Sequence, residues 1–103
     1  MLNIWYIEVE NKIIAVMMMK QLDENTGRIE NVCCNIQYRG KGINSKLLNE
    51  VVKYSREIGL IKLKVGTYEK LQSAIKFYEK NGFIEQKELR NPEKKSVYFE
   101  LEI

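Results

Sequence analysis

A short glycine-rich turn, residues 37 to 43 with the sequence QYRGKGI, constrains the fold of this chain more than any other feature. It follows a strand-like run from Ile29 to Ile36 and opens a helix-like run from Ile43 to Ile58. The first N–H groups of a helix have no partner inside the helix, and the helix dipole favours negative charge there. A strand, a glycine-rich turn and a helix start in this order are typical of an anion-binding site.

The residue types within the turn favour a phosphate group as the anion. Gly40 and Gly42 have no Cβ, so the backbone can approach a phosphate closely. Arg39 and Lys41 add positive charge, and an arginine can bind phosphate through two hydrogen bonds. The residues alone therefore predict a diphosphate-binding turn, with a merely structural strand-to-helix turn as the alternative.

Two common phosphate motifs do not fit this turn. A P-loop has four residues between its glycines, whereas one residue separates Gly40 from Gly42. The dinucleotide fingerprint requires a third glycine where Ser45 stands, and an acidic residue about twenty positions further on, where residues 60 to 63 contain none. The sequence thus leaves the identity of the phosphate ligand open at this point.

Composition narrows the class of protein. With 103 residues and 45% hydrophobic residues, we expect one folded domain spanning 1–103. The net charge of +3 comes from interleaved acidic and basic residues, which argues against a nucleic-acid partner. The longest apolar run, Ile13 to Met19, is too short to cross a membrane. The chain has no histidine, which removes the usual neutral-pH base and the usual metal ligand, so we expect no metal site.

The two cysteines, Cys33 and Cys34, are adjacent in a strand-like run. Successive strand side chains point to opposite faces, so we expect no disulfide between them. Two unpaired cysteines favour a reducing compartment, and we expect a cytoplasmic protein.

Hydrophobic periodicity predicts six strands and two helices. Residues 13 to 19 are continuously apolar, which favours a central strand buried on both faces. Gly66 and Thr67 are expected to end the fourth strand. The expected elements are strands over 4–10, 13–19 and 28–36, a helix over 43–58, a strand over 61–65, a helix over 71–78, and strands over 83–89 and 96–103.

This order, β-β-β-α-β-α-β-β, predicts a mixed α/β sheet. The first strands are joined by short turns and should pair antiparallel. The helix between the third and fourth strands implies a right-handed crossover and a parallel pair.

Two motifs give this chain a specific resemblance to the GNAT superfamily of acetyl-CoA-dependent N-acyltransferases. Residues 37 to 42 (QYRGKG) fit the signature Gln/Arg-x-x-Gly-x-Gly/Ala, and residues 74 to 83 (AIKFYEKNGF) look like the family's helix end A-x-x-x-Y-x-K-x-G-F. The resemblance covers about residues 5 to 103. It implies a GNAT-like mixed α+β fold without the family's usual N-terminal strand and two helices, which line the acceptor site.

The resemblance also implies an acetyl-CoA site. Backbone amides of the turn would hold the pyrophosphate, and backbone groups of Val32 and Cys34 would bond the pantetheine arm. The Val32 N–H would serve as oxyanion donor for the thioester carbonyl. The implied cofactor-binding set is completed by Gln37, Tyr38, Arg39, Gly40, Lys41, Gly42, Ile43, Asn44, Ser73 and Phe77.

The family's catalytic positions correspond to Tyr78 and Glu30. Tyr78 would protonate the departing thiolate, as a phenol whose pKa lies near 10 remains protonated at neutral pH. Glu30 would act as general base for the amine. The alternative roles are a core aromatic for Tyr78, which is compatible with catalysis, and a salt-bridged strand carboxylate for Glu30.

The resemblance departs from the family pattern in two places. Asn44 replaces a frequent glycine, and an asparagine common before the second helix is absent, since Tyr68 and Glu69 stand there. The first strand, 4–10, would be an open sheet edge, so we expect a homodimer, or a partner chain, that covers it.

The implied function is acetyl transfer from acetyl-CoA to a primary amine by direct attack in a ternary complex. A different class is a CoA-binding module without catalysis, whose acceptor site is absent or supplied by another chain. A small basic nucleic-acid binder is a third class, and the mixed charge argues against it.

Overall fold

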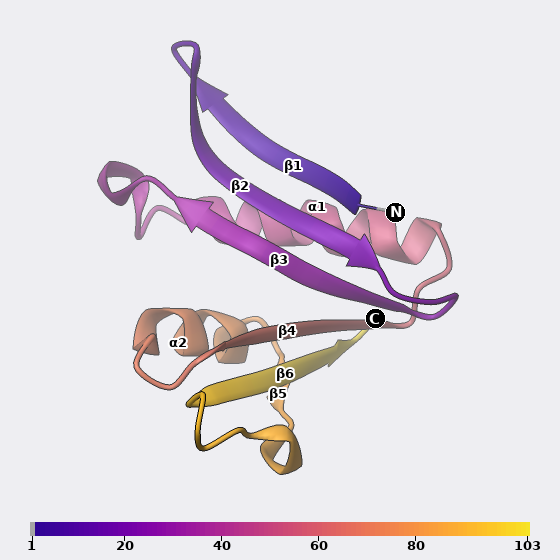
Figure 1. Ribbon diagram of the computed structural model, residues 1–103. Coiled ribbons are helices and arrows are strands. Elements are labelled where there is room, and N and C mark those ends of the chain that lie inside the picture. Colours follow the sequence, from indigo (N-terminus) through magenta and orange to yellow (C-terminus); the bar gives the residue numbers. More distant parts are fainter. Residues whose placement is uncertain (1) are drawn as a thin grey trace.

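The computed structural model describes residues 2–103 and shows one mixed sheet with two helices (Figure 1). The sheet order is β1-β2-β3-β4-β6-β5, and only the β3–β4 pair is parallel. The strands are β1 Leu2–Val9, β2 Lys12–Gln21, β3 Thr26–Cys34, β4 Lys62–Tyr68, β5 Ile84–Glu85 and β6 Ser96–Glu102. The helices are α1 Ile43–Glu57 and α2 Gln72–Lys80, with 3-10 turns η1 Ile36–Tyr38 and η2 Lys87–Leu89. The expected order of elements and the mixed α/β fold are confirmed.

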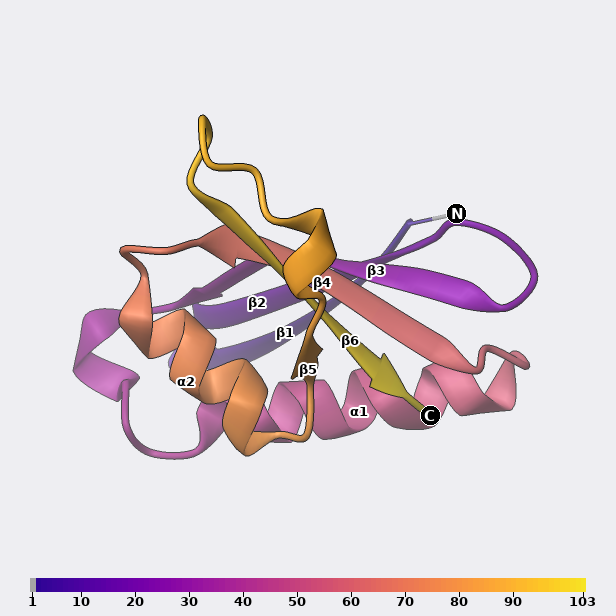
Figure 2. The same ribbon diagram turned by 90° about the horizontal axis from the view of Figure 1, so that it is seen from below.

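Both helices lie on one side of the sheet, whereas the loop before β6 extends beyond the other side (Figure 2). We call the sheet face opposite the helices the open face; on β1 to β3 it carries Leu2, Ile4, Tyr6, Val16, Met18, Arg28, Glu30 and Cys33. Neither helix in the described part of the chain has the length and apolar character that a bilayer crossing requires.

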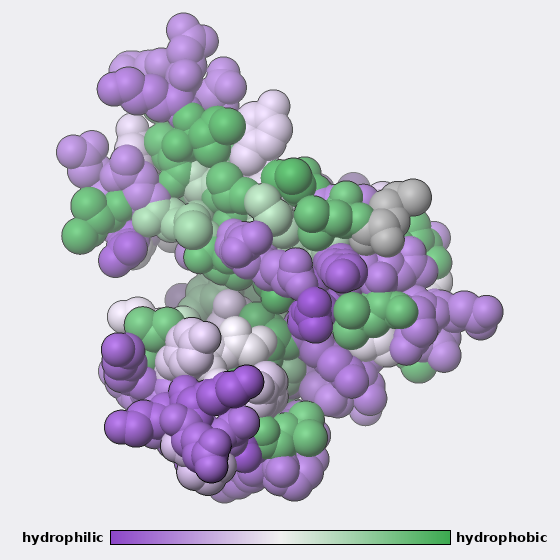
Figure 3. All heavy atoms as spheres, in the orientation of Figure 1, coloured by the Kyte–Doolittle hydropathy of each residue, from purple (hydrophilic) through white to green (hydrophobic). Residues whose placement is uncertain are grey.

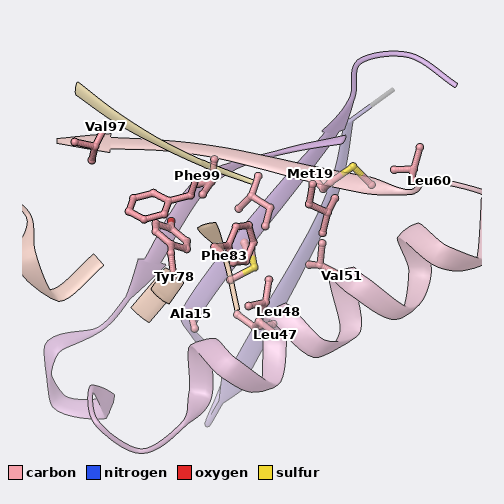
Figure 4. Close-up of a cluster of buried hydrophobic side chains, with 14 residues drawn as sticks. Ala15, Met19, Leu47, Leu48, Val51, Leu60, Tyr78, Phe83, Val97 and Phe99 are labelled. Carbon is pink, nitrogen blue, oxygen red and sulfur yellow. The ribbon is translucent and has the colours of Figure 1, made fainter. Parts of the chain in front are cut away.

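The core lies between the sheet and the helices (Figure 4). Residues with full burial come from β2, α1, β4 and β6, and they pack into one apolar cluster. This arrangement follows from the sequence pattern, because alternate strand residues and every third or fourth helix residue are apolar. The most deeply buried side chains are Met17, Met19, Val51, Ser55, Leu63 and Phe99.

The expectation that β2 is buried on both faces is wrong for the open face. Ile13 is 58% exposed, and Val16 and Met18 are only partly buried. The helices cover the other face of β2, where Ala15 and Met17 are buried. The described residues therefore leave one side of this continuously apolar strand uncovered.

Two element boundaries also differ from expectation. The fourth strand continues through Gly66 and Thr67 to Tyr68, because the Tyr98 ring of β6 packs directly over Gly66. The expected strand over 83–89 is a strand only at Ile84–Glu85. Beyond it the chain turns, and the paired side chains of Glu85 and Arg90 close the turn.

Candidate active site

The strands β3 and β4 separate along most of their length. They pair only from Thr26 to Arg28, opposite Lys62 to Lys64, and then diverge toward their carboxyl ends (Figure 1). The space-filling view shows a hollow between the two halves of the molecule on this side (Figure 3). The edge of β3 beyond Arg28 therefore has backbone groups with no strand partner on the β4 side.

A β-bulge in β3 lies just beyond the last β3–β4 pair. The register with β2 runs from Met18 opposite Glu30 to Val16 opposite Cys33, so two β3 residues face one β2 residue. Asn31 has φ +50° at this point. A bulge bends a strand and resets its alternation. As a result, Val32 and Cys34 both pack toward the core on the helix side, and Cys33 is exposed.

The backbone groups of Val32 and Cys34 in β3 face the space between the diverging strands β3 and β4, which we call the opening. The Asn35 N–H donates to the Ile14 carbonyl at 2.7 Å, so it points toward β2. Since successive strand N–H groups point to opposite sides, those of Cys34 and Val32 point away from β2. Both residues also pack against the buried cluster that contains Tyr78.

The turn after β3 is built by local hydrogen bonds. Asn35 caps η1, because its side-chain oxygen accepts from the Gln37 N–H at 2.9 Å. Its carbonyl accepts from the Tyr38 N–H at 2.9 Å. The helix α1 then begins at Ile43, as predicted from the sequence, with Gly42 at its N-cap position.

The turn leaves a run of backbone donors free. Gly40 and Gly42 have φ of +79° and +77°, a region that glycine adopts without strain. Within the described residues, the N–H groups from Gly40 through Ser45 donate to no protein acceptor, and α1 has no acidic residue in its first turn. A Cβ at either glycine would meet no atom within 4 Å, so the space beside both is open. This arrangement fits a phosphate group.

Asn44 lies in the first turn of α1. Its Oδ1 atom is buried and has no hydrogen-bond partner among the described residues. Because this atom has no accessible surface, a bound molecule could reach it only after the side chain moves.

The basic side chains of the turn are partly engaged with the protein. Arg39 donates from Nε to the Cys34 carbonyl at 3.3 Å, which ties the turn to the end of β3. Lys41 Nζ lies 5.6 Å from the centroid of the Tyr38 ring, a cation–π distance. The terminal nitrogens of Arg39 have no partner in the described structure, so they remain available to an anion.

Tyr78 lies in α2, the helix on the other side of the gap from the end of β3 (Figure 1). It is 4% exposed, and its ring packs against Phe77, Phe83 and Phe99 with centroids 5.4 to 5.9 Å away (Figure 4). Burial raises the pKa of Tyr78 to about 12. The expectation of a pKa near 10 is therefore corrected, although the hydroxyl is still protonated at neutral pH. The aromatic cluster shows that Tyr78 is a core residue, and this does not exclude a chemical role.

The raised pKa of Tyr78 makes the folded protein lose stability in alkali. Between pH 10 and 12 the unfolded chain releases this proton while the native state keeps it, so the free energy of unfolding falls as pH rises. We expect a loss of about 2 kcal/mol by pH 12 from this group. Urea unfolding from about pH 9 to pH 11.5 should show a shallower pH dependence in Tyr78→Phe. Tyr68→Phe, which alters an exposed tyrosine, should keep the wild-type dependence; equal slopes in both variants would contradict the assignment.

Glu30 lies on the open face, two residues beyond the last β3–β4 pair. Its carboxylate accepts two hydrogen bonds from Arg28, at 2.6 and 2.9 Å. Its side chain thus lies on the sheet face opposite the helices, whereas Tyr78 belongs to the core on the helix side. The salt-bridged state that the sequence left as an alternative is the one observed, and a carboxylate in such a pair can still accept a proton.

Two further positions of the predicted set lie on α2. Ser73 is exposed in the first turn of the helix, and Phe77 is half buried beside Tyr78. The opening therefore brings together β3, the turn with the start of α1, and α2. Sequence reasoning missed the bulge at Asn31 and the Asn35 cap; an asparagine directly after a strand and before a turn is the signal that favours such a cap.

Comparisons with known proteins agree with this geometry. A family model described as the acetyltransferase (GNAT) family matches residues 2–83. A GNAT family acetyltransferase from Elizabethkingia anophelis, solved with acetyl-CoA bound, is 20% identical and has a TM-score of 0.82, with coverage of 97% of this chain and 75% of that one. No curated protein sequence matches the chain.

Two other solved structures have the same fold. A GNAT family acetyltransferase from Staphylococcus aureus is 25% identical and has a TM-score of 0.87. The alignment covers 98% of this chain and 67% of the Staphylococcus chain. The PaiA N-acetyltransferase from Thermoplasma acidophilum, in complex with coenzyme A, is 17% identical and has a TM-score of 0.89. The alignment covers 99% of this chain and 61% of the Thermoplasma chain. Since the family model matches residues 2–83, which is most of the chain, this chain belongs to the GNAT acetyltransferase family.

Proposed function

We propose that this protein is an N-acetyltransferase that moves an acetyl group from acetyl-CoA to a primary amine. The observation that carries the proposal is the opening between β3 and β4, which ends at the free N–H groups of Gly40 to Ser45. The opening offers a path for an extended thioester arm, and the turn offers donors for a diphosphate. The bound acetyl-CoA of the Elizabethkingia structure supports the same co-substrate.

The geometry of the turn and of β3 supports the following binding roles. The N–H groups of the turn hold the pyrophosphate, with Arg39 and Lys41 supplying charge. The backbone of Val32 and Cys34 pairs with the pantetheine arm as an added strand would. Asn44 contributes its backbone N–H, which donates to no protein acceptor in the described residues. Gln37, Tyr38, Ser73 and Phe77 complete the lining.

The chemical step needs two proton movements and one new bond. The amine nitrogen attacks the thioester carbonyl carbon, the C–N bond forms, and the C–S bond breaks. Glu30, directly or through water, takes the proton that the amine loses, and Tyr78 gives a proton to the departing thiolate. The Val32 N–H stabilises the charge that develops on the carbonyl oxygen. Holding both substrates in one complex supplies much of the rate.

Glu30 has a direct test. Glu30→Gln keeps the shape and the Arg28 contact but cannot accept the proton, so we expect kcat to fall about 100-fold at neutral pH and to recover partly at high pH. Steady-state kinetics against pH would measure this. Glu100→Gln is the matched control, because Glu100 is a strand carboxylate paired with Lys62 and Lys64. An unchanged pH profile in Glu30→Gln would remove Glu30 from the reaction.

The proposal as a whole is tested by two measurements. Calorimetry with coenzyme A should show heat of binding, and a panel of amines should release free thiol from acetyl-CoA. Binding without release on any amine would instead favour a CoA-binding module; the chain spans 75% and 61% of the Elizabethkingia and Thermoplasma chains, so parts of those structures have no counterpart here. No heat of binding to folded protein would overturn both functions.

A cytoplasmic location is part of the proposal, because Cys33 and Cys34 are both free thiols and one of them is exposed.

We also infer a homodimer through β1. This strand is a sheet edge, and Leu2, Ile4 and Tyr6 are each at least half exposed on its open face. Its only charged residue is Glu8, so two copies of β1 can pair antiparallel about a twofold axis without facing like charges at the centre. The pair would join the two open faces into one apolar surface.

Analytical ultracentrifugation tests this assembly. We expect wild-type protein to sediment as a dimer, and Ile4→Lys with Tyr6→Lys to sediment as a monomer, since lysines that face one another across the paired strands would repel. Ile84→Lys is the control, because Ile84 is 70% exposed on the other sheet edge, β5. A wild-type monomer at high concentration would contradict the dimer.

A further inference from the structure

A pocket of about 570 Å³ lies at the carboxyl end of β4, lined by Tyr68, Glu69, Lys70, Lys94 and Lys95. One wall follows β4 and the other precedes β6, and backbone hydrogen bonds connect them. The Glu69 N–H donates to the Lys95 carbonyl at 2.9 Å, and Tyr68 pairs with Ser96 in the sheet. The pocket is therefore formed by fixed backbone at the end of two strands.

The charge in this pocket is mostly positive and uncompensated. Its lining has three lysines and one carboxylate. The ion pairs among the described residues join Arg28 with Glu30, Lys62 and Lys64 with Glu100, and Arg90 with Glu85, and none includes a pocket lysine. Glu69 also acts on Arg90: the pKa of Arg90 is raised, chiefly by its hydrogen bonds to Glu85 and in smaller part by the charge of Glu69. Figure 3 shows hydrophilic side chains gathered in the lower part of this half of the molecule.

The pocket lies at the end of β4 that is furthest from β3. The two strands pair only near their amino ends, so the opening between them is widest at their carboxyl ends, where Tyr68 lies. The side chains of Val65 and Thr67 point to the helix side, so that of Tyr68 lies on the open face, together with Gly66 and Tyr98. Glu30 lies on the same open face, on the neighbouring strand β3. The glycine turn leads into α1 on the helix side.

We propose that this pocket binds an anionic group of the acceptor, so that the preferred substrate is a small amine carrying a carboxylate or phosphate. The ammonium groups of Lys70, Lys94 and Lys95 would neutralise the anion, and the Tyr68 hydroxyl would donate a hydrogen bond. The identification of the ligand as an acceptor rests on the proposed acetyl transfer. Binding of an anion to the pocket can be measured without turnover.

The test uses matched pairs of probes on protein saturated with coenzyme A. Calorimetry compares 4-aminobutanoate with 4-aminobutanamide and phosphoethanolamine with ethanolamine, which separates the carboxylate and phosphate arms. We expect at least one acidic probe to bind about tenfold more tightly than its partner without the anion, with an affinity that falls as salt rises. Equal binding within both pairs would overturn the inference.

Variants connect the preference to the pocket. Lys94→Ala combined with Lys95→Asn should reduce the affinity for the preferred acidic probe about tenfold and leave coenzyme A binding unchanged. Asparagine suits position 95, where φ is +54°. Lys87→Ala is the control, because Lys87 belongs to the same β5–β6 connection and does not line the pocket. An acidic preference that survives the double variant would overturn the assignment to this pocket.

The outcomes also separate this inference from the proposed function. Thiol release on amines without preference for acidic ones would overturn the pocket alone. Lysine-dependent binding of an acidic probe without thiol release on any amine would support the pocket and overturn the transferase.

Discussion

Tyr78→Phe should lower kcat by about 10²- to 10⁴-fold while the affinity for coenzyme A changes less than about twofold. The substitution removes one hydroxyl and keeps the ring contacts with Phe83 and Phe99. With a pKa of about 12, the Tyr78 hydroxyl holds its proton throughout the neutral range, so it is always present as a donor. As the sulfur of the leaving group gains negative charge, loss of that donor raises the barrier to C–S cleavage.

A matched variant separates this chemical role from packing. Tyr54→Phe removes the hydroxyl of a partly buried tyrosine in α1, which packs edge-on against Trp5 of the edge strand β1 with centroids 5.4 Å apart. We expect Tyr54→Phe to keep wild-type kcat, and both variants to unfold at similar urea concentrations near neutral pH. If Tyr78→Phe turned over acetyl-CoA as fast as Tyr54→Phe, Tyr78 would be a core residue only.

The local parts of this fold could be predicted from the sequence. Gly40 and Gly42 after an apolar strand predicted the turn, and the spacing of Leu47, Leu48 and Val51 predicted α1. These features depend on residues within a few positions of one another, so pattern and turn chemistry are sufficient. The helix start at Ile43 is confirmed for this reason.

The separation of β3 from β4 could not be derived from local pattern. It depends on a bulge at Asn31, which the polar residues Glu30 and Asn31 within the strand-like run do not by themselves predict, and on the pairing of β4 with β6, which is distant in the sequence. Only the family resemblance implied it. The same limit applies to residues 83 to 89, whose alternation resembles a strand until Glu85 meets Arg90.

The residue types of the site could be predicted from the sequence, whereas the contacts that these residues make could not. Arg39 was expected as a phosphate ligand, but its Nε also binds the carbonyl of Cys34, a contact set by the folded turn. The high pKa of Tyr78 results from burial among aromatic residues that lie up to about twenty positions further along the chain. Such environments exist only after folding, so sequence reasoning assigned the ordinary value.

Gly42→Val should weaken coenzyme A binding at least about 100-fold, the largest effect we expect on the co-substrate. At φ +77° a β-branched residue is strained, and relief of that strain would move the N–H groups at the start of α1. The valine side chain would also occupy the space beside Gly42, where no protein atom lies within 4 Å. Calorimetry with coenzyme A measures the loss directly.

Gly59→Val is the control that makes this result specific to the turn. Gly59 follows α1 at φ +91°, also with no protein atom within 4 Å of an added Cβ, so its substitution carries a similar backbone strain at the other end of the same helix. Each substitution should cost about 1 to 3 kcal/mol of stability, measured by urea unfolding. Only Gly42→Val should lose coenzyme A. If both variants bound it with wild-type affinity, the N–H groups from Gly40 to Ser45 would not be the diphosphate site, and the proposed transferase would have no place to hold its co-substrate.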